Sequence, residues 1–456
     1  MPRTAAQLRE DVLRIWLAGV TAVRSPRLIF DTVEVADGDL RLGDEWVRLD
    51  GIRRIAVVGG GKAAAGMTQA LEQALGPAVL QQKHLHGLVS VPDDCLLPTD
   101  AVKLFPGRPA GLNEPTAEGL RGAHQMLRLV AELHPQDLCI CLLSGGASAL
   151  LPAPIEGISL ADKLALTREM SARGATIHQM NAVRRELSHI KGGGLARACR
   201  ASRLVALIIS DVPGDDVSLI GSGPTVQISD GVVRAIAALR TLALTDLPAG
   251  RRAIKILEDR LDSHPRPPSL DLKTTSHCCQ VANVIIGNNS MAVDAAGAEA
   301  ERLGYSHAMI AANEPEGDAE EVARKLVEMA RQMRNDSGPD CLITGGEPTV
   351  RLAPATIRGR GGRNQQLCLA ALAEERDWRD VALISGGVDG EDGPTDAAGA
   401  VVDESVTENA NALGLNPRDF LARNDAYSFF TRTGGLLKTG PTHTNVCDLR
   451  VITVSR

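Results

Sequence analysis

Hydrophobic positions along the chain form short, β-branched runs that end at glycines, and each run is followed by a stretch that favours helix. Ile52–Val58 is such a run; a glycine turn before Lys62 ends it, and Ala63–Leu75 is rich in helix-forming residues. The order recurs at Leu138–Leu143 and at Leu204–Ser210, the most strand-like run in the chain. Strands that alternate with helices are typical of α/β proteins with mostly parallel sheets.

The pattern is interrupted between residues 247 and 275, where prolines cluster around a charged helix. It starts again at Val284–Ile286 and continues to the final apolar strand. With 456 residues, the chain is too long for one ordinary hydrophobic core. We therefore expect an N-terminal α/β domain over residues 1–246, a linker over 247–275 and a C-terminal α/β domain over 276–456.

Composition narrows the classes of function. Aromatic residues make up only 2% of the chain and the net charge is −7, so neither base stacking nor a basic surface favours nucleic-acid binding. The nine cysteines form no paired C-x-x-C set, which is typical of reduced thiols in the cytoplasm. One long uncharged run, Leu138–Ile155, is interrupted by glycines and prolines, and the N-terminal segment lacks a signal-peptide core. We expect a cytoplasmic protein with no membrane or nucleic-acid partner; homo-oligomerisation stays open.

The stretch 341–372 combines a strand, glycines, arginines and a helix. Glycines such as Gly345 and Gly346 allow backbone N–H groups to approach an anion, and the start of a helix adds a positive dipole end. Arg363, the third of three arginines spaced among glycines, stands directly before the helix-like run and can bind a phosphate or carboxylate with two N–H donors. The alternative is a mobile surface loop with solvated arginines.

Lys62 stands at a glycine turn that opens a helix. Gly59, Gly61 and Ala64 fit the loose dinucleotide pattern G-x-G-x-x-A, but no acidic residue follows at the distance that a ribose partner needs. A P-loop is excluded because Ala63, and not Ser or Thr, follows the lysine. The turn therefore suits an anion; a solvated lysine in the first turn is the alternative.

Two further segments have the composition of anion sites. Ser144 begins a glycine loop after a buried strand; it lacks the G-x-S-x-G elbow of a nucleophile, so we expect the loop to donate backbone N–H groups. Arg184 and Lys191 are seven residues apart and thus share one helical face, in a basic segment that ends in three glycines. A solvated basic face is the alternative.

Acidic residues follow two strands. Asp211 comes directly after Leu204–Ser210, at the sheet edge where open α/β proteins bind ligands, and can accept a proton or hold Mg²⁺. Asp389 lies in an acidic glycine loop whose spacing excludes an EF-hand. That loop can hold Mg²⁺ or orient a hydroxylated substrate, or it is a solvated turn.

These motifs together resemble the type II glycerate kinases, which have a glycerate-kinase N-terminal domain and a C-terminal MOFRL domain. The resemblance runs in unchanged order from about Ile52 to the C-terminus and includes GGGKAAAGM, LLSGGASAL, NAVRRELSHIKGGGLA, ISDVPGDD, GSGPT, TGGEPTV, GRGGRNQQ, SGGVDGEDGPTDAAGA and TGPTHTNVCDLRV. It implies a Rossmann-like, mostly parallel α/β/α sandwich, a second α/β domain with a mixed sheet, and an active site in the cleft between them. It also implies phosphorylation of D-glycerate with ATP and Mg²⁺, typically to 2-phosphoglycerate.

By the resemblance, Lys62 and Arg363 are catalytic, and Asp211 joins them. We expect the two cations to stabilise charge on the transferring phosphoryl group, and Asp211 to orient the attacking hydroxyl or, with Asp389, to hold Mg²⁺. The glycine loops are expected to hold phosphates or substrate through Gly60, Gly61, Ser144, Gly145, Gly146, Gly345, Gly346 and Glu347. Glycerate is expected at Arg184, Lys191 and Asn364.

Two other functions stay open. Members of this family are also labelled hydroxypyruvate reductases, which would make the chain an NAD(P)H-dependent oxidoreductase. The missing acidic ribose partner counts against that function. A non-catalytic sugar-phosphate sensor is the other alternative, since it would need the glycine loops but not the Lys62, Arg363 and Asp211 set.

Overall fold

The computed structural model describes residues 2–229, 231–263, 279–375 and 377–455, and these form two compact units. Unit 1 comprises the described residues of Met1–Leu28, Ile209–Asp215 and Gly287–Arg456, and unit 2 comprises those of Ile29–Ile208 and Asp216–Ile286. Among the described residues, no helix combines the length and the hydropathy that a membrane span requires. The expectation of two α/β domains is confirmed.

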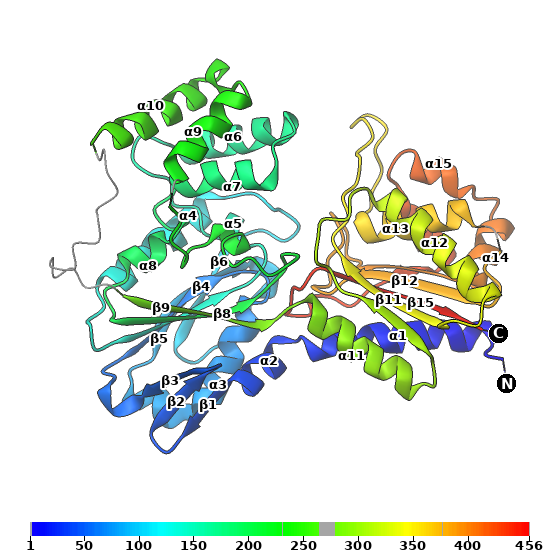
Figure 1. Cartoon of the computed structure of the whole chain (residues 1–456), viewed down its shortest axis with the longest axis horizontal. Coiled ribbons are helices and arrows are strands. Elements are labelled where there is room, and N and C mark those ends of the chain that lie inside the picture. The colour runs from blue at the N-terminus through cyan, green and yellow to red at the C-terminus, as the bar shows by residue number, and fades with distance from the viewer. Residues whose placement is uncertain (1, 230, 264–278, 376, 456) are drawn as a thin grey trace. The chain divides into compact units, whose positions relative to one another are not determined.

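A six-stranded sheet forms the centre of unit 2 (Figure 1). In spatial order its strands are β6 (Val102–Arg108), β5 (His86–Pro92), β4 (Ile55–Gly60), β7 (Leu138–Leu143), β8 (Arg203–Ile209) and β9 (Gln280–Gly287). From β6 to β8, neighbouring strands are parallel. Every residue of β4 and β7 is buried, which is why both are continuous apolar runs in the sequence.

The helices of unit 2 form two groups. One group covers the sheet, with α3 on one face and α4, α5 and α8 on the other (Figure 1). The second group, α6, α7, α9 and α10, packs around an apolar core of its own. Their bounds are α3 (Ala64–Gln82), α4 (Ala117–Ala131), α5 (Ala147–Leu150), α6 (Leu160–Ala172), α7 (Ile177–Glu186), α8 (Gly194–Ala198), α9 (Gly231–Thr241) and α10 (Pro248–Ser263).

Unit 1 is built on a mixed sheet, as the resemblance implied. Its strands in spatial order are β10 (His307–Ile310), β11 (Cys341–Gly346), β15 (Asp448–Val454), β12 (Val381–Gly387), β13 (Gly399–Val402) and β14 (Leu436–Leu437). Only β10 and β11 are parallel; the other pairs are antiparallel. The helices are α1 (Ala5–Ala22), α11 (Asn289–Arg302), α12 (Ala319–Asn335), α13 (Arg363–Glu374), α14 (Glu404–Ala412), α15 (Pro417–Leu421) and α16 (Ala426–Thr433), and α2 (Ser25–Thr32) connects the units along the chain.

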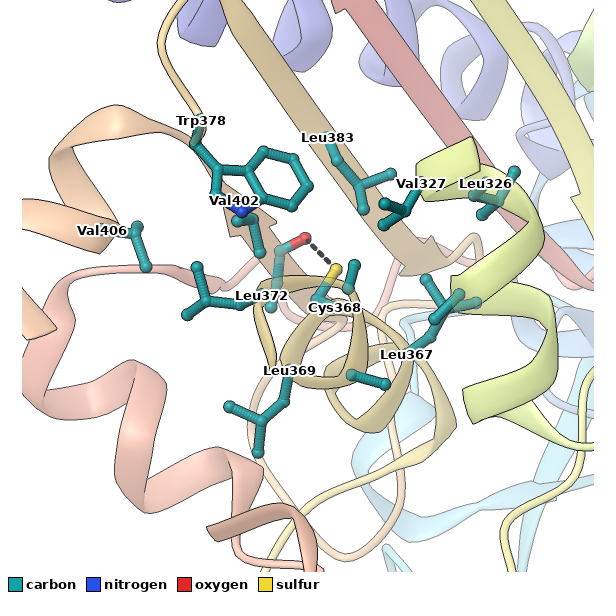
Figure 2. Packing of buried hydrophobic residues seen from close by; sticks show 14 of the residues in the cluster. Leu326, Val327, Leu367, Cys368, Leu369, Leu372, Trp378, Leu383, Val402 and Val406 are labelled. Carbon is teal, nitrogen blue, oxygen red and sulfur yellow. Dashed lines mark hydrogen bonds between the residues drawn. The ribbon is translucent and has the colours of Figure 1, made fainter. Parts of the chain in front are cut away.

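A hydrophobic core of unit 1 surrounds α13, which packs between the sheet and helices α12, α15 and α16. Figure 2 shows Leu367 and Cys368 of α13 in one apolar cluster with Leu383 of β12 and Val327 of α12. Leu367 to Leu372 are all buried, so this helix is apolar on nearly every side. The start of α13 is thereby held in a fixed position, which matters because it carries Arg363.

The division into units differs from the expected domains at both ends of the expected N-terminal domain, residues 1–246. Helix α1 begins at a capping box between Thr4 and Gln7 and packs on α11, β12 and β15 of unit 1. Its Trp16 is fully buried and donates from Nε1 to the backbone oxygen of Leu449 at 3.0 Å. In the expected linker, Pro248–Ser263 is helix α10 of unit 2, held by the apolar face it buries against α6 and α9; residues 264–278 lie outside the described residues.

Several expected glycine loops are instead the last residues of strands. Gly60, Gly345 and Gly346 belong to β4 and β11. A Cβ at Gly345 would collide with the side chain of Asn289, and one at Gly346 with the carboxylate of Glu316. Glycine is required at these two positions by close packing inside unit 1.

A small antiparallel sheet was absent from the sequence-based prediction. It consists of β1 (Val33–Ala36), β2 (Asp39–Leu42) and β3 (Glu45–Arg48), in that order. The three strands have four residues each and are joined by turns at Gly38 and Gly43, both at positive φ. Runs of this length are too short for periodicity to separate them from turns.

Candidate functional site

In unit 2, the turns after β4 and β7 are hydrogen-bonded to each other and to β5. The N–H of Lys62 donates to the oxygen of Gly145 at 2.9 Å, and the N–H of Ala63 donates to Oγ of Ser144 at 3.0 Å. The N–H of Gly61 donates to the oxygen of Ser90 at 3.1 Å. The backbone N–H groups of Gly61, Lys62 and Ala63 are therefore engaged within the unit, which disfavours the phosphate contact expected at Gly61.

The side chain of Lys62, which is half-buried, lies over Gly146. A Cβ built at Gly146 would stand 3.3 Å from Cγ of Lys62 and 3.8 Å from Nη2 of Arg108. Gly146 has φ of +82°, so glycine also meets a backbone requirement here. Within the described residues, the N–H groups of Gly145 and Gly146 have no hydrogen-bond acceptor. The backbone N–H groups of this loop can thus donate to a ligand, as expected, and the side chains of Lys62 and Arg108 lie beside it.

Lys191 is held by α5, the short helix that directly follows this loop. It is 3% exposed, and its Nζ donates to the backbone oxygen of Ser148 at 2.7 Å and to Oγ of Ser148. Oγ of Ser148 lies 3.1 Å from Oγ of Ser222, which donates to Oδ1 of Asn181 at 3.0 Å. Lys191 is therefore a fixed, buried cation, and its solvated alternative is excluded by its burial.

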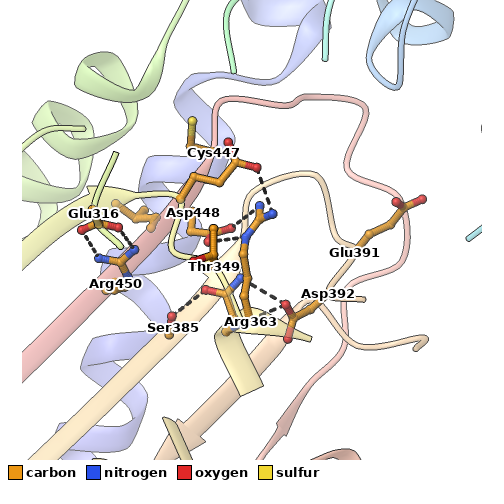
Figure 3. A network of polar contacts seen from close by, with 12 residues as sticks. Glu316, Thr349, Arg363, Ser385, Glu391, Asp392, Cys447, Asp448 and Arg450 are labelled. Carbon is orange, nitrogen blue, oxygen red and sulfur yellow. Dashed lines mark hydrogen bonds and ion pairs between the residues drawn. The ribbon is translucent and has the colours of Figure 1, made fainter. Parts of the chain in front are cut away.

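In unit 1, Arg363 is the first residue of α13 and binds two carboxylates (Figure 3). Its Nε and Nη2 donate to Asp448 at 2.7 and 3.0 Å, and its Nη1 lies 2.9 Å from Oε1 of Glu347. Asp448 is fully buried, whereas 40% of the Glu347 side chain is exposed. Burial alone would raise the pKa of Asp448, but the charge and hydrogen bonds of Arg363 hold it below its usual value.

Glu347 lies in an acidic environment. Burial raises its pKa to about 7; the charge of Arg363 opposes this rise, while Asp211, Asp448 and Asp389 add to it. Asp211 itself accepts from Nδ2 of Asn445 at 3.3 Å. The structure therefore brings together four residues that the sequence singled out in separate segments: Asp211, Glu347, Arg363 and Asp389.

Asn364, expected to bind substrate, is completely buried. Its Oδ1 accepts from Oγ of Ser385 at 2.6 Å, and its Nδ2 lies 3.4 Å from Oδ1 of Asp392. Asp392 also accepts from the backbone N–H groups of Asn364 and Gln365 at 3.0 and 2.9 Å, so it caps the start of α13. Asn364 is thus part of the support that positions Arg363, and its side chain presents nothing to a ligand.

A magnesium ion fits the chemistry of this acidic group. Mg²⁺ prefers oxygen donors and is usually held by one or two carboxylates together with water and substrate phosphates. Among the described residues, no group of three or more His, Cys, Asp or Glu side chains is arranged to hold a metal ion by itself. Asp211, Asp389 and Glu347 could supply one or two oxygens, while Asp448 is already engaged by both donors of Arg363.

Several residues of the site were missed by the sequence-based reasoning. Asp448 was visible as the acidic residue before the final apolar strand, in the TNVCDLRV segment, but nothing marked it as the partner of Arg363. Arg450, 1% exposed, binds Glu316 with two donors at 2.8 and 2.6 Å, and nothing in the local pattern separates it from a surface residue. Arg108 is likewise buried with no signal in its surroundings.

Comparison with known proteins assigns both halves of the chain. Residues 11–255 match a family described as a domain of unknown function (DUF4147), and residues 340–448 match the MOFRL family. The chain is 38% identical over 98% of its length to a glycerate kinase from Homo sapiens, of which it covers 93%. It is 36% identical over 88% of its length to an Agrobacterium vitis protein named putative hydroxypyruvate reductase, of which it covers 87%. The crystal structure of a glycerate kinase from Thermotoga maritima matches with a TM-score of 0.77 and 30% identity, over 98% of this chain and 99% of that one.

Proposed function

The chain belongs to the glycerate kinase family with DUF4147 and MOFRL domains, and from this premise we propose that it transfers the γ-phosphoryl group of ATP to D-glycerate and forms 2-phosphoglycerate. The observation that carries the proposal is the likeness to glycerate kinases over almost the whole chain, in sequence and in structure. A partial match to one domain would support the fold alone. Here the segments that contain Lys62 and Arg363 both fall inside the matched regions.

The geometry of Arg363 suits charge neutralisation in phosphoryl transfer. The transition state of this reaction is loose, and catalysis depends on positioning and on cations beside the phosphoryl oxygens. Asp448 fixes the guanidinium through Nε and Nη2. Glu347 is the more exposed partner and binds only Nη1, so its contact is the one that a phosphoryl oxygen would replace. In this proposal, Lys62 provides the second cation and Asp211 orients the attacking hydroxyl.

Mg²⁺ is the cofactor that the acidic group of unit 1 suits best. When bound with ATP, it would neutralise charge between the phosphates. Asp211, Asp389 and Glu347 are the residues proposed to hold it, with one or two oxygens at a time. The raised pKa of Glu347 supports this assignment, because a carboxylate that resists ionisation among other acids favours a nearby cation.

The direct test is to incubate the protein with D-glycerate, MgATP and buffer and to identify the product by phosphorus NMR. The expected result is 2-phosphoglycerate, recognised by the coupling of its phosphorus to the proton on carbon 2. Formation of 3-phosphoglycerate would contradict the regiochemistry and keep the kinase activity. Absence of any phosphoglycerate, with ATP intact, would contradict the function.

Hydroxypyruvate reduction is the second candidate, because relatives from Agrobacterium vitis carry that name. It requires a dinucleotide whose pyrophosphate contacts the N–H groups of the first glycine turn. At the turn after β4 those donors are bound to Gly145, Ser144 and Ser90, which disfavours this activity. Incubation with hydroxypyruvate and NADH or NADPH, followed at 340 nm, is expected to give no oxidation. A sugar-phosphate sensor would bind glycerate or ATP without turnover in the kinase assay.

A cytoplasmic location is proposed on the state of the thiols. Among the described residues, Cys139, Cys141, Cys199, Cys341, Cys368 and Cys447 are buried thiols outside any disulfide, which is typical of a reducing compartment. Fractionation of the native host, with this chain followed by antibody, tests the location. Recovery with an extracellular or membrane fraction would contradict it.

A further inference from the structure

Lys163, on helix α6, is a buried lysine without a partner. It is 7% exposed, and among the described residues its Nζ is shielded from solvent and has no hydrogen-bond acceptor. A buried ammonium group normally has a carboxylate or carbonyl beside it, because removing the charge from water is unfavourable. Nothing in the sequence pattern distinguished this residue, and the proposed mechanism does not use it.

Its charged neighbours are cations. Helix α6 packs on α7, which carries Arg184, and Lys191 follows that helix on the same segment. The pKa of Lys163 is lowered to about 8 by burial and by the charge of Arg184. The pKa of Lys191 is lowered well below its usual value by burial, with further contributions from Lys163 and Arg184. No carboxylate contributes to either shift.

Of these cations, Lys191 is held in place by hydrogen bonds, whereas Arg184 is not held by any within the described part of the chain. Lys191 is fixed by Ser148 of α5, the short helix that follows the loop over which Lys62 lies. Arg184 is half-buried and, within the described residues, makes no hydrogen bond or ion pair; burial lowers its pKa. Three positive groups that share a buried region and repel one another destabilise the empty protein. A bound anion would compensate all three at once.

We propose that Lys163, Arg184 and Lys191 form an oxyanion subsite of unit 2, and that Lys163 is a specificity-determining residue of that subsite. The ligand is an oxyanion group of a substrate: the carboxylate of glycerate or a phosphate of ATP. Both present oxygens that accept from ammonium and guanidinium donors, and a neutral sugar or a ketone does not. The inference rests on the proposed function for the identity of the two substrates, but the subsite itself follows from the unpartnered charge.

The test compares wild-type protein with Lys163→Met, a variant of similar length without the charge. Isothermal titration with D-glycerate alone and with the ATP analogue AMP-PNP plus Mg²⁺ measures each arm separately. We expect Lys163→Met to weaken one of the two ligands by about tenfold or more and to leave the other unchanged. Loss on the glycerate arm assigns the carboxylate, and loss on the nucleotide arm assigns a phosphate. Equal affinity of both proteins for both ligands would overturn the proposal.

Matched variants separate binding from folding. Lys255→Met removes an exposed lysine from α10 of the same unit and is expected to bind both ligands normally. The melting temperature of the empty Lys163→Met protein should equal or exceed that of wild type, since an uncompensated charge is removed. If Lys163→Met does not fold, Arg184→Met provides the same comparison of affinities. Lys163→Arg keeps the positive charge and should therefore bind both ligands with an affinity close to that of wild type. The titrations measure binding and need no turnover. Absence of kinase activity would therefore contradict the proposed function, while the measured affinities would still decide whether the subsite exists.

Discussion

The guanidinium of Arg363 binds the carboxylate of Asp448 through two donors, Nε at 2.7 Å and Nη2 at 3.0 Å. Asp448 is fully buried at the first position of β15, and Arg363 is the first residue of α13. The pair therefore joins the central strand of the mixed sheet to the helix at the centre of its core. Arg363 has two tasks that mutation must separate, one in stability and one in the proposed chemistry.

Removal of Arg363 alone is expected to destabilise the protein. Arg363→Met leaves Asp448 charged and buried, which costs several kcal/mol in fully buried pairs; because 32% of the arginine side chain is exposed, we expect about 2 kcal/mol. The double variant Arg363→Met with Asp448→Asn should recover part of that loss. Urea denaturation of the wild type, both single variants and the double variant measures the coupling. Independent, additive effects would show that the pair is not coupled.

Lys62→Met is the cleaner test of catalysis. Lys62 is half-buried and is anchored through its backbone N–H, which the substitution keeps. We expect turnover with D-glycerate and MgATP to fall by about 100-fold or more, as when a charge-stabilising donor is removed from an active site. The melting temperature should stay near that of wild type. Lys255→Met is the control, and similar turnover in the two variants would remove Lys62 from the mechanism.

The stability of the empty protein should rise with pH in the alkaline range because of Lys163. Its pKa is about 8 in the folded state against 10.5 for an ordinary lysine, so between these values the unfolded chain binds more protons. Stability is then fully present above pH 10.5 and is lost as pH falls through 8, by up to about 3 kcal/mol. Chemical denaturation from pH 7 to 10 should show this rise in wild type and a smaller one in Lys163→Met. Parallel curves would mean that Lys163 ionises normally.

Glu347 should have the opposite dependence on pH. Its folded pKa of about 7 exceeds the ordinary 4.5, so the stabilisation of its protonated form is present below pH 4.5 and is lost as pH rises through 7. Glu347→Gln cannot ionise, and its melting temperature relative to wild type should therefore increase from pH 5 to pH 8. The exposed Glu408→Gln on α14 should show no such trend. A constant difference between Glu347→Gln and wild type would disprove the shift.

Gly345→Ala tests whether the glycines after Cys341 serve packing. The new methyl group would meet the side chain of Asn289, which is hydrogen-bonded to Val446, Asp448 and Ala312 and cannot move easily. We expect a loss of about 2 kcal/mol in unfolding free energy, typical of overpacking. Gly338→Ala, where a Cβ meets nothing within 4 Å, should change stability by less than about 0.5 kcal/mol. Equal losses of unfolding free energy in the two variants would show that Gly345 is not required for packing.

The sequence predicted elements well where apolar runs are long and buried on both faces. Leu138–Leu143 was predicted as a strand and is β7 with the same bounds, and Leu204–Ser210 was predicted as a strand and is β8 (Arg203–Ile209), displaced by one residue. The four-residue strands β1 to β3 were missed, since so few residues carry no periodicity. The domain bounds differed because α1 packs on unit 1, a long-range preference that local pattern does not encode.

For the site, residue type and spacing predicted candidates but not their surroundings. Arg363, Glu347, Asp211 and Asp389 lie together as charged neighbours, and Lys62 lies over the glycine loop at Gly146. Asn364 was expected to bind glycerate and is buried, because Ser385 and Asp392 bind its amide from segments distant in sequence. Lys163 could not be found at all, since the absence of a partner is a property of the folded unit only. The prediction that the active site lies in a cleft between the domains stays a prediction.

The position of β15 has a consequence for synthesis on the ribosome. Strand β15 stands between β11 and β12, yet it is translated after both of them and after β13 and β14. The nascent chain therefore holds β11 and β12 without their common neighbour until residue 454 has emerged, whereas the sheet of unit 2 needs nothing beyond residue 287. We therefore expect the sheet of unit 2 to fold during translation. The sheet of unit 1 cannot be completed until β15 is synthesised, and until then β11 and β12 each have one unpaired edge, which favours aggregation or chaperone binding.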